Sequence, residues 1–188
     1  FTEFHTAAPV CMPNRASILT ARYPSVHGLK YNGCALSPNA RTFVETLKDG
    51  GYQTAAIGKS HLQPFSGVDV ARIKSPDPSV PVLEAWKCDF GGLDIESPYY
   101  YEDDERLEIP LPYYGYDHVD MVTGHGDTAG GHYLQWLREQ DPKWAEYRDP
   151  ANQLPHNYTC PQAKRTRLPA ELYPTRYIEN SACDWLET

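Results

Sequence analysis

The residues best suited to do chemistry lie in the segment Cys11-Met12-Pro13-Asn14-Arg15. Pro13 favours the first turn of a helix, which would place the Cys11 thiol beside the free backbone N–H groups of the helix N-terminus. The positive end of the helix dipole stabilises an anion there. Arg15 lies four residues on, and helical side chains tilt toward the N-terminus, so its guanidinium can reach back over Cys11. The segment predicts an anion site that contains a reactive atom.

The same pair has a plainer explanation when it is taken alone. A cysteine followed by an arginine four positions later is most often a buried structural cysteine and a surface arginine. A protein tyrosine phosphatase is excluded, because that class has its cysteine six positions before the arginine with glycine between, whereas Pro13 lies in this shorter gap. The residues around the pair therefore decide between the interpretations.

A second segment with cationic side chains is Gly58-Lys59-Ser60-His61-Leu62. Residues two apart in an extended segment point to the same side, so Lys59 and His61 can converge on one ligand. Alone, such a pattern usually belongs to a surface loop, and its meaning depends on the first segment.

Both segments resemble the signature of the type I sulfatases of the alkaline phosphatase superfamily, which reads C-x-P-x-R, A-S-x-L-T-G and, later, G-K-x-H-L. Asn14 stands where serine is usual and Ala21 where glycine is usual, both outside the core pattern that the modifying enzyme reads. The residues that match the first part are Cys11, Pro13, Arg15, Ala16, Ser17, Leu19 and Thr20, followed by Tyr23-Pro24 and His27-Gly28.

The resemblance implies a role for each of these side chains. Cys11 would be oxidised to formylglycine by a formylglycine-generating enzyme or an equivalent maturase. One hydroxyl of the hydrated aldehyde would attack sulfur and displace the alcohol, and deprotonation of the other would then collapse the hemiacetal and expel sulfate. Arg15 and Lys59 would hold the sulfate. His61 would contact the sulfate or the leaving-group oxygen, with a protonated imidazole as general acid. His125, in a glycine-rich loop, is a candidate substrate-binding residue, with a hydrogen-bonded turn as the alternative.

The resemblance also implies a divalent cation beside the formylglycine, usually calcium, with magnesium or manganese as alternatives. Its carboxylate ligands are expected before Phe1 and beyond Thr188, so within this chain only the modified Cys11 would belong to the metal site. A hard cation needs about six oxygen ligands. We therefore expect the chain to be an internal portion of a sulfatase that is inactive by itself.

The implied activity is that of a sulfuric ester hydrolase acting on a small-molecule sulfate monoester. Lys59 and His61 favour this substrate, because phosphonate monoester hydrolases of the same superfamily use uncharged residues in that loop. The stretches from Pro112 to Val119 and from Gly124 to Asp127 are nevertheless similar to bacterial members near the branch point between the two activities. A phosphonate monoester or phosphodiester hydrolase, and a non-catalytic anion-binding relative, are the alternatives.

The composition excludes several other classes. With 25 acidic and 17 basic residues the net charge is -8, which argues against nucleic-acid binding. No apolar run reaches the length of a membrane span. The five cysteines are scattered without a C-x-x-C pair, which argues against a zinc site and a disulfide scaffold. We further expect a location in the bacterial cytoplasm or periplasm, with any signal region outside the chain. We also expect that the protein can form a homo-oligomer.

The elements that must position these residues are typical of an α/β fold. We expect part of an alkaline-phosphatase-like mixed sheet sandwiched by helices, with residues 1–65 as the core segment. Residues 66–188 would form an irregular Pro/Tyr-rich insertion and the continuation of the same catalytic domain, whose terminal parts lie outside the chain. The expected elements are an extended segment over 1–10, helices over 13–22, 42–50, 132–139 and 175–186, loops and short strands over 63–112, and strands over 52–57 and 116–122.

Overall fold

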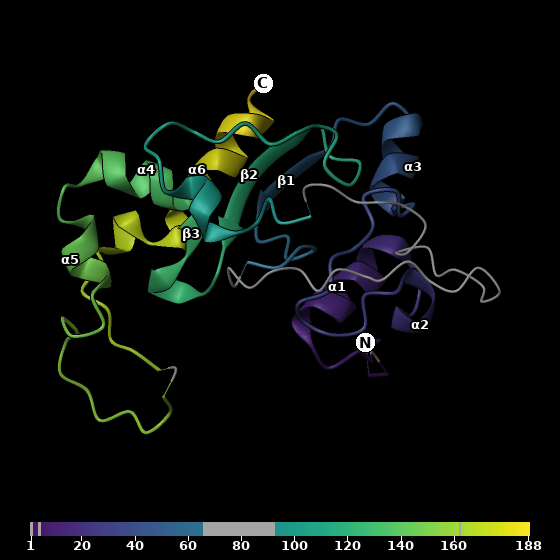
Figure 1. The fold of residues 1–188 in the computed structure, drawn as a ribbon. Helices are drawn as coiled ribbons and strands as arrows, with labels where there is room; N and C mark the ends of the chain where they lie inside the picture. The colour runs from purple at the N-terminus through teal and green to yellow at the C-terminus, as the bar shows by residue number, and fades with distance from the viewer. Residues whose placement is uncertain (1, 4, 66–92, 162) are drawn as a thin grey trace.

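The computed structural model describes residues 2–3, 5–65, 93–161 and 163–188, which form a three-stranded sheet with helices around it (Figure 1). β1 (Ala55–Gly58) pairs in parallel with β2 (His118–Thr123), in a register that places Gly58 opposite Met121. β2 pairs antiparallel with β3 (Gly130–Gly131). The predicted α/β class with a mixed sheet is confirmed.

The helix that begins with Cys11 is α1 (Cys11–Thr20), which starts two residues before the predicted Pro13. It ends at Thr20, because Ala21 at its C-cap has a left-handed backbone with φ 54°, so α1 ends two residues before the predicted end at about Arg22. Pro24 then opens the short helix α2 (Pro24–His27), since the fixed φ of proline suits the first turn of a helix.

The predicted capping box is confirmed at the start of α3 (Phe43–Asp49). The Thr42 hydroxyl accepts from the Glu45 backbone N–H at 3.2 Å, and the Glu45 carboxylate accepts from the Thr42 N–H at 2.8 Å. Thr42 also donates its hydroxyl proton to the Tyr114 carbonyl at 3.0 Å. The cap therefore fixes both the start of α3 and its distance from the chain that leads into β2.

The strands begin later than their sequence patterns predicted. The Tyr52 N–H closes α3 by bonding to the Leu47 carbonyl at 3.1 Å, so β1 starts only at Ala55. Three of the four β1 residues are half-buried, which differs from the predicted buried strand, because β2 is the only strand among the described residues that pairs with β1. β2 is buried over its last five residues.

The second half of the chain holds more helix than its proline content predicted. α4 (His132–Gln140) and α6 (Pro174–Leu186) confirm the predicted helices, while α5 (Trp144–Arg148) was not predicted. The described residues of the stretch 1–10 form no strand, and part of the stretch 63–112, residues 66–92, lies outside the described residues. Short 3-10 turns are η2 (Pro98–Tyr101), η3 (Gly126–Thr128) and η4 (Ala170–Leu172).

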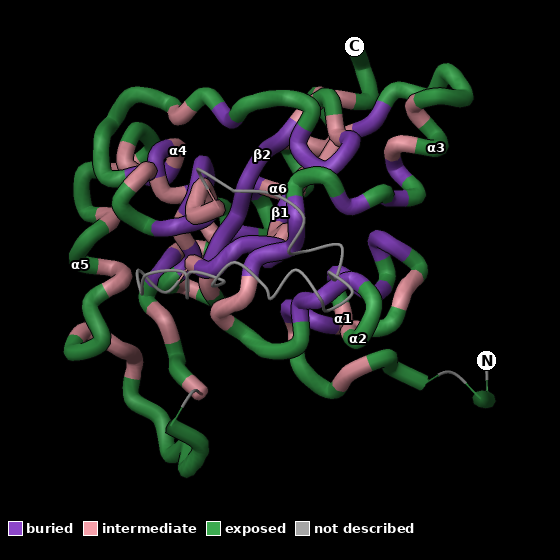
Figure 2. The backbone as a smooth tube through the Cα atoms, turned by 45° about the vertical axis from the view of Figure 1, so that its right-hand side comes forward, coloured by how far each residue is buried: buried purple, intermediate pink, exposed green. Residues whose placement is uncertain are grey.

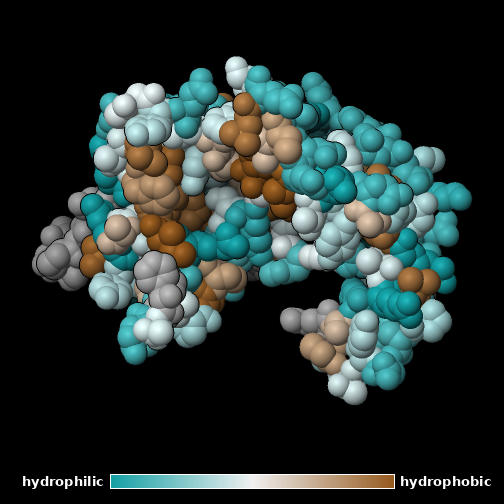
Figure 3. Space-filling view, turned by 180° about the vertical axis from the view of Figure 1, so that it is seen from behind, coloured by the Kyte–Doolittle hydropathy of each residue, from teal (hydrophilic) through white to brown (hydrophobic). Residues whose placement is uncertain are grey.

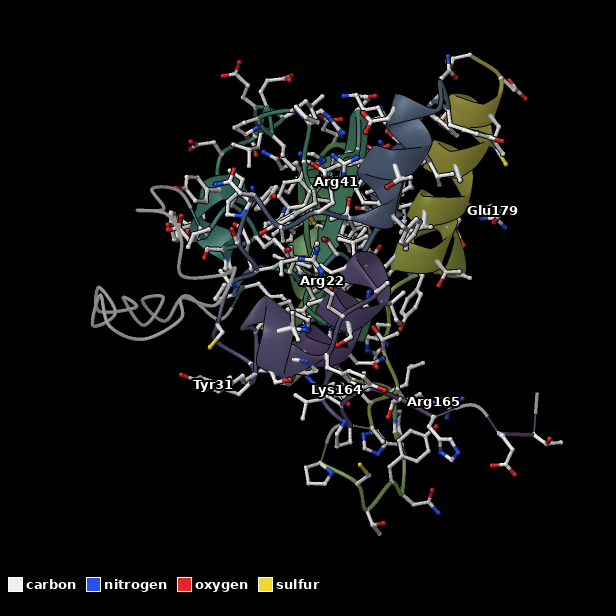
Figure 4. The ribbon with its side chains drawn as sticks, turned by 90° about the vertical axis from the view of Figure 1, so that its right-hand side faces the viewer. Arg22, Tyr31, Arg41, Lys164, Arg165 and Glu179 are labelled. Atoms are coloured by element: carbon white, nitrogen blue, oxygen red, sulfur yellow. The ribbon has the colours of Figure 1, made fainter. Side chains whose placement is uncertain are left out.

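The core lies on the two faces of β2 (Figure 2). Val119 and Met121 point into a cluster with residues of α1 and α3, and Val122 points into a second cluster with α4 and α6, because side chains alternate along a strand. In the side view of Figure 4, α1 lies below α3, and α6 packs against β1 and β2. None of the helices described is long and apolar enough to cross a membrane.

We expect Thr42→Ala to lower the free energy of unfolding by about 1 to 2 kcal/mol, because it removes the cap of α3 and the bond to Tyr114. Urea denaturation of the product of the complete reading frame measures this change. Thr159→Ala, at an exposed loop position, is the matched control. Equal midpoints for the two variants would contradict the prediction.

Candidate active site

The site begins with a bond between α1 and the loop that follows β1. The Arg15 guanidinium donates to the Lys59 backbone carbonyl at 2.7 Å, across 44 residues of sequence. The structure therefore brings the two predicted segments together at the carboxyl end of β1, the edge at which α/β sheets bind ligands. One N–H group of the Arg15 guanidinium is therefore used to bind the loop backbone, and the others stay available for the predicted anion.

Cys11 is the first residue of α1 and is half-buried. Its Sγ lies 3.4 Å from Nδ2 and 3.5 Å from Oδ1 of Asn32, and the Met12 N–H donates to the same Oδ1 at 3.3 Å. Val10, at the N-cap, makes no side-chain cap. Asn32 thus caps the helix from a distant loop while it contacts the reactive atom.

Lys59 points toward the end of the neighbouring strand. Its Nζ donates to the Gly124 carbonyl at 3.2 Å, lies 3.4 Å from Nε2 of His125, and sits 4.8 Å from the centre of the Phe65 ring. β1 and β2 are parallel, so the loops that follow Gly58 and Thr123 leave the sheet at the same edge. This topology explains why residues 65 positions apart meet.

His61 is buried, with 5% of its surface exposed, and its backbone is left-handed with φ 56°. Its ring stacks on Phe65 with centroids 4.0 Å apart. Burial lowers the pKa of His61 to about 3, with further lowering by the charges of Lys59, Arg15 and His125. The imidazole is therefore neutral at pH 7 before an anion binds, which differs from the protonated state that the general-acid role requires.

His125 forms the hydrogen-bonded turn that was one of its two interpretations, while its role as a substrate-binding residue stays a prediction. Its carbonyl accepts from the hydroxyl and the N–H of Thr128 at 2.8 and 3.2 Å, which makes the hydrogen-bonded turn. Its ring nevertheless faces Lys59 and meets Phe65 edge-on at 6.0 Å. Burial lowers the pKa of His125, and the charges of Lys59 and Arg15 lower it further.

The positive charges of Arg15 and Lys59 repel each other and disfavour protonation of the two nearby histidines. The positive charge of Arg15 lowers the pKa of Lys59, His61 and His125 alike, while burial is the larger cause in each case. Such a cluster is unfavourable without a compensating negative charge. The arrangement is suited to bind a small anion, although the whole chain is acidic.

Two residues of the site carried no recognised signal in the sequence. Asn32 precedes Gly33, whose φ is 100°, so Asn-Gly predicts only a turn. Phe65 follows a proline in a stretch that predicted loops. Both act through contacts distant in sequence or through ring stacking, which no local spacing encodes.

A cleft of about 350 Å³ opens next to these residues, on the side of β1 that faces α1 and α3. Arg15, Lys59 and Ser60 form its polar wall, and Ile18 and Phe43 belong to its apolar wall. Seen from behind, the surface carries apolar patches in the half that holds α1 and α3 (Figure 3). Cys11, His61 and His125 are not in this lining, so the cleft adjoins the basic cluster rather than containing it.

The described residues do not fit a calcium site by themselves. Within ranges 2–3, 5–65, 93–161 and 163–188, no three histidine, cysteine, aspartate or glutamate side chains gather as metal ligands. Among the described residues, the amide oxygen of Asn32 contacts the Cys11 thiol, whereas calcium requires about six oxygen ligands.

Comparison with known proteins gives one family. The family model described as Sulfatase matches residues 1–118. Arylsulfatase G of Rattus norvegicus is 43% identical over 67 residues, covering 33% of this chain and 13% of that protein. Steryl-sulfatase of the same species is 40% identical over 72 residues, covering 32% of this chain and 12% of that protein. An ulvan-active sulfatase of Formosa agariphila is 42% identical over 62 residues, covering 33% of this chain and 12% of that protein. The match spans 12–13% of these relatives' lengths.

We expect the His61 ring to stay neutral between pH 8 and 5 in the folded protein, as measured by histidine NMR with His61→Gln for assignment. Because its folded pKa of about 3 lies below the ordinary 6.5, the unfolded chain takes up the proton first. The contribution of His61 to folding stability is therefore complete above about pH 6.5 and is lost as the pH falls toward 3. The urea-unfolded protein is the control, and a folded-state titration near 6.5 would contradict the prediction.

Proposed function

Because the chain belongs to the sulfatase family, we propose that the protein hydrolyses a sulfate monoester of a small molecule. The proposed catalytic residues are Cys11, Arg15, Lys59 and His61, with His125 as a further substrate contact. The observation that carries the proposal is the convergence of Arg15 and Lys59 through the 2.7 Å bond between the guanidinium and the loop carbonyl.

The basic cluster supplies what a sulfate ester needs from its binding site. Negative charge on the sulfate oxygens compensates the repulsion between Arg15 and Lys59 and favours protonation of the two histidines. The bond from Arg15 to the Lys59 carbonyl holds the guanidinium in place before the substrate arrives, and the bond from Lys59 Nζ to the Gly124 carbonyl holds the ammonium. Cations that need no reorganisation stabilise the developing charge of the transition state better than mobile ones.

The proposed nucleophile is a formylglycine made from Cys11 by a maturase. That group would supply the hydrated aldehyde whose hydroxyl attacks sulfur. Two features of the chain fit it: Cys11 is at the positive end of α1, and the Asn32 amide lies within 3.4 Å of the atom that would be replaced. The Asn32 Nδ2 would donate a hydrogen bond to an oxygen at this position and hold its orientation.

The two histidines have different proposed tasks. A bound anion near His61 raises its pKa from about 3, since a nearby negative charge favours the protonated ring. Protonated in this way, His61 would donate to the leaving-group oxygen. His125 presents Nε2 to Lys59 and orients the ammonium toward the substrate.

Modification of Cys11 is the first expected outcome. We expect mass spectrometry of the peptide that ends at Arg15 to show SH₂ replaced by oxygen, in the product of the complete reading frame made with the modifying enzyme. The peptide that contains Cys34 is the internal control and should keep its thiol. An alkylatable thiol at Cys11 under these conditions would favour the non-catalytic relative.

Loss of the loop cation is the second expected outcome. Lys59→Ala should lower kcat/KM for an aryl sulfate by about 100-fold or more, because it removes a positive charge aimed at the sulfate. His125→Ala should lower it by about tenfold. The matched control is His156→Ala, an exposed loop residue.

The same assays separate the alternatives. Aryl sulfate, aryl phosphonate and phosphodiester substrates are compared on the modified wild-type protein. A preference for phosphonate or phosphodiester would replace sulfate ester hydrolysis by the neighbouring activity, and unchanged kcat/KM in Lys59→Ala would remove Lys59 from the site.

A further inference from the structure

Glu96 is a fully buried acid that no part of the proposed reaction uses. Its carboxylate accepts four hydrogen bonds. Oε2 accepts from the His61 N–H at 2.8 Å, and Oε1 accepts from the Leu62 and Gln63 N–H groups at 2.8 and 3.1 Å. The fourth donor is the Tyr113 hydroxyl, at 2.8 Å from Oε1.

Three consecutive amides that point at one spot form a concave site for an anion. In this protein the anion is supplied by the chain itself. The arrangement requires an unusual backbone at its first residue, since His61 is left-handed at φ 56° without being glycine. That conformation is sterically unfavourable for a residue with a side chain, and charge-assisted bonds from the amides to Glu96 offset the cost.

The segment around Glu96 holds the loop at further points. The Gln63 side-chain carbonyl accepts from the Ile95 N–H at 2.9 Å, next to Glu96 in sequence. On the other side, the Leu62 carbonyl accepts from the Leu36 N–H at 2.8 Å. The loop is therefore bound on both sides, and the carboxylate is the point where three of its N–H groups meet.

We propose that Glu96 is a positioning residue that fixes the backbone of residues 61–63 so that His61 and Lys59 face the sulfate. The proposal rests on the proposed function, because it assigns the orientation of that site to a residue outside it. Glu96 acts through the loop and touches neither Cys11 nor the substrate.

The carboxylate is chemically specific for this task. It has acceptors only, and all four of its neighbours are donors. Glutamine has the same shape but carries an amide nitrogen, which would place its N–H groups against one of the donors. Burial raises the pKa of Glu96, while the bonds from Tyr113 and the amides favour the ionised form.

A residue that only stabilised the fold would give a different signature. Partial unfolding lowers the concentration of active enzyme and hence the apparent kcat, but it leaves the inhibition constant for inorganic sulfate unchanged. Displacement of His61 and Lys59 within folded protein weakens sulfate binding itself. The inhibition constant therefore distinguishes the two roles.

The test compares Glu96→Gln with the wild-type product of the complete reading frame, after modification of Cys11. The inhibition constant for inorganic sulfate should rise by about tenfold, since charged hydrogen bonds that orient the loop are lost. The kcat/KM for an aryl sulfate should fall by about 10- to 100-fold. Glu102→Gln, at an exposed position, is the matched control.

Tyr113→Phe provides a second variant in case Glu96→Gln does not fold. It removes one donor to Oε1 and leaves the three amide bonds, so the inhibition constant should rise in the same direction by a smaller factor. The His61 ring signals in NMR should shift in both variants, with or without turnover. Unchanged inhibition constants and unchanged His61 signals in folded variants would overturn the proposal.

These experiments distinguish failure of the proposed function from failure of the proposed role of Glu96. A wild-type protein with formylglycine that neither cleaves aryl sulfate nor binds sulfate would contradict the proposed function. The His61 signals would then still report whether Glu96 orients the loop. Wild-type turnover combined with unchanged variants would contradict only the role of Glu96.

Discussion

The hydrogen bond from Arg15 to the Lys59 carbonyl is the contact on which the site depends, because it joins two segments that are otherwise carried by different elements. Arg15 belongs to the helix that begins with the cysteine, and Lys59 to the loop that leaves the sheet. This bond fixes the position of Cys11, at the start of α1, relative to the loop that carries Lys59. The negative charge of Glu96 and the face of the Phe65 ring favour the charged form of Lys59 and so partly offset the cost of holding it beside Arg15.

Much of this arrangement could be predicted from local patterns. The cysteine beside a proline predicted the start of α1 to within two residues, and Thr42 with Glu45 predicted the start of α3. These signals are local, since caps and prolines act within one turn of helix. The strand boundaries were less accurate, because the chain leaving α3 makes further bonds before it joins β2.

The remaining features arise from contacts between distant residues. Glu96 lies in a stretch for which the sequence predicts loops. Its role becomes visible only through its bonds to amides more than thirty positions away. Asn32 contacts Cys11 across 21 positions. The neutral state of His61 is likewise a property of burial and of three neighbouring charges, so the motif predicted the residue but not its protonation.

The parallel pairing of β1 and β2 also separates two tasks in the sequence. The reactive helix and the first loop contain the family's signature, whereas His125 comes from the turn after β2, whose far end is fixed by pairing with β3. The two ends of this turn, Thr123 and Gly130, are paired in the sheet, while Gly124 and His125 within it contact Lys59. A change of sequence within this turn would therefore alter what lies beside Lys59, while the pairing of β2 with β3 keeps both ends of the turn in place.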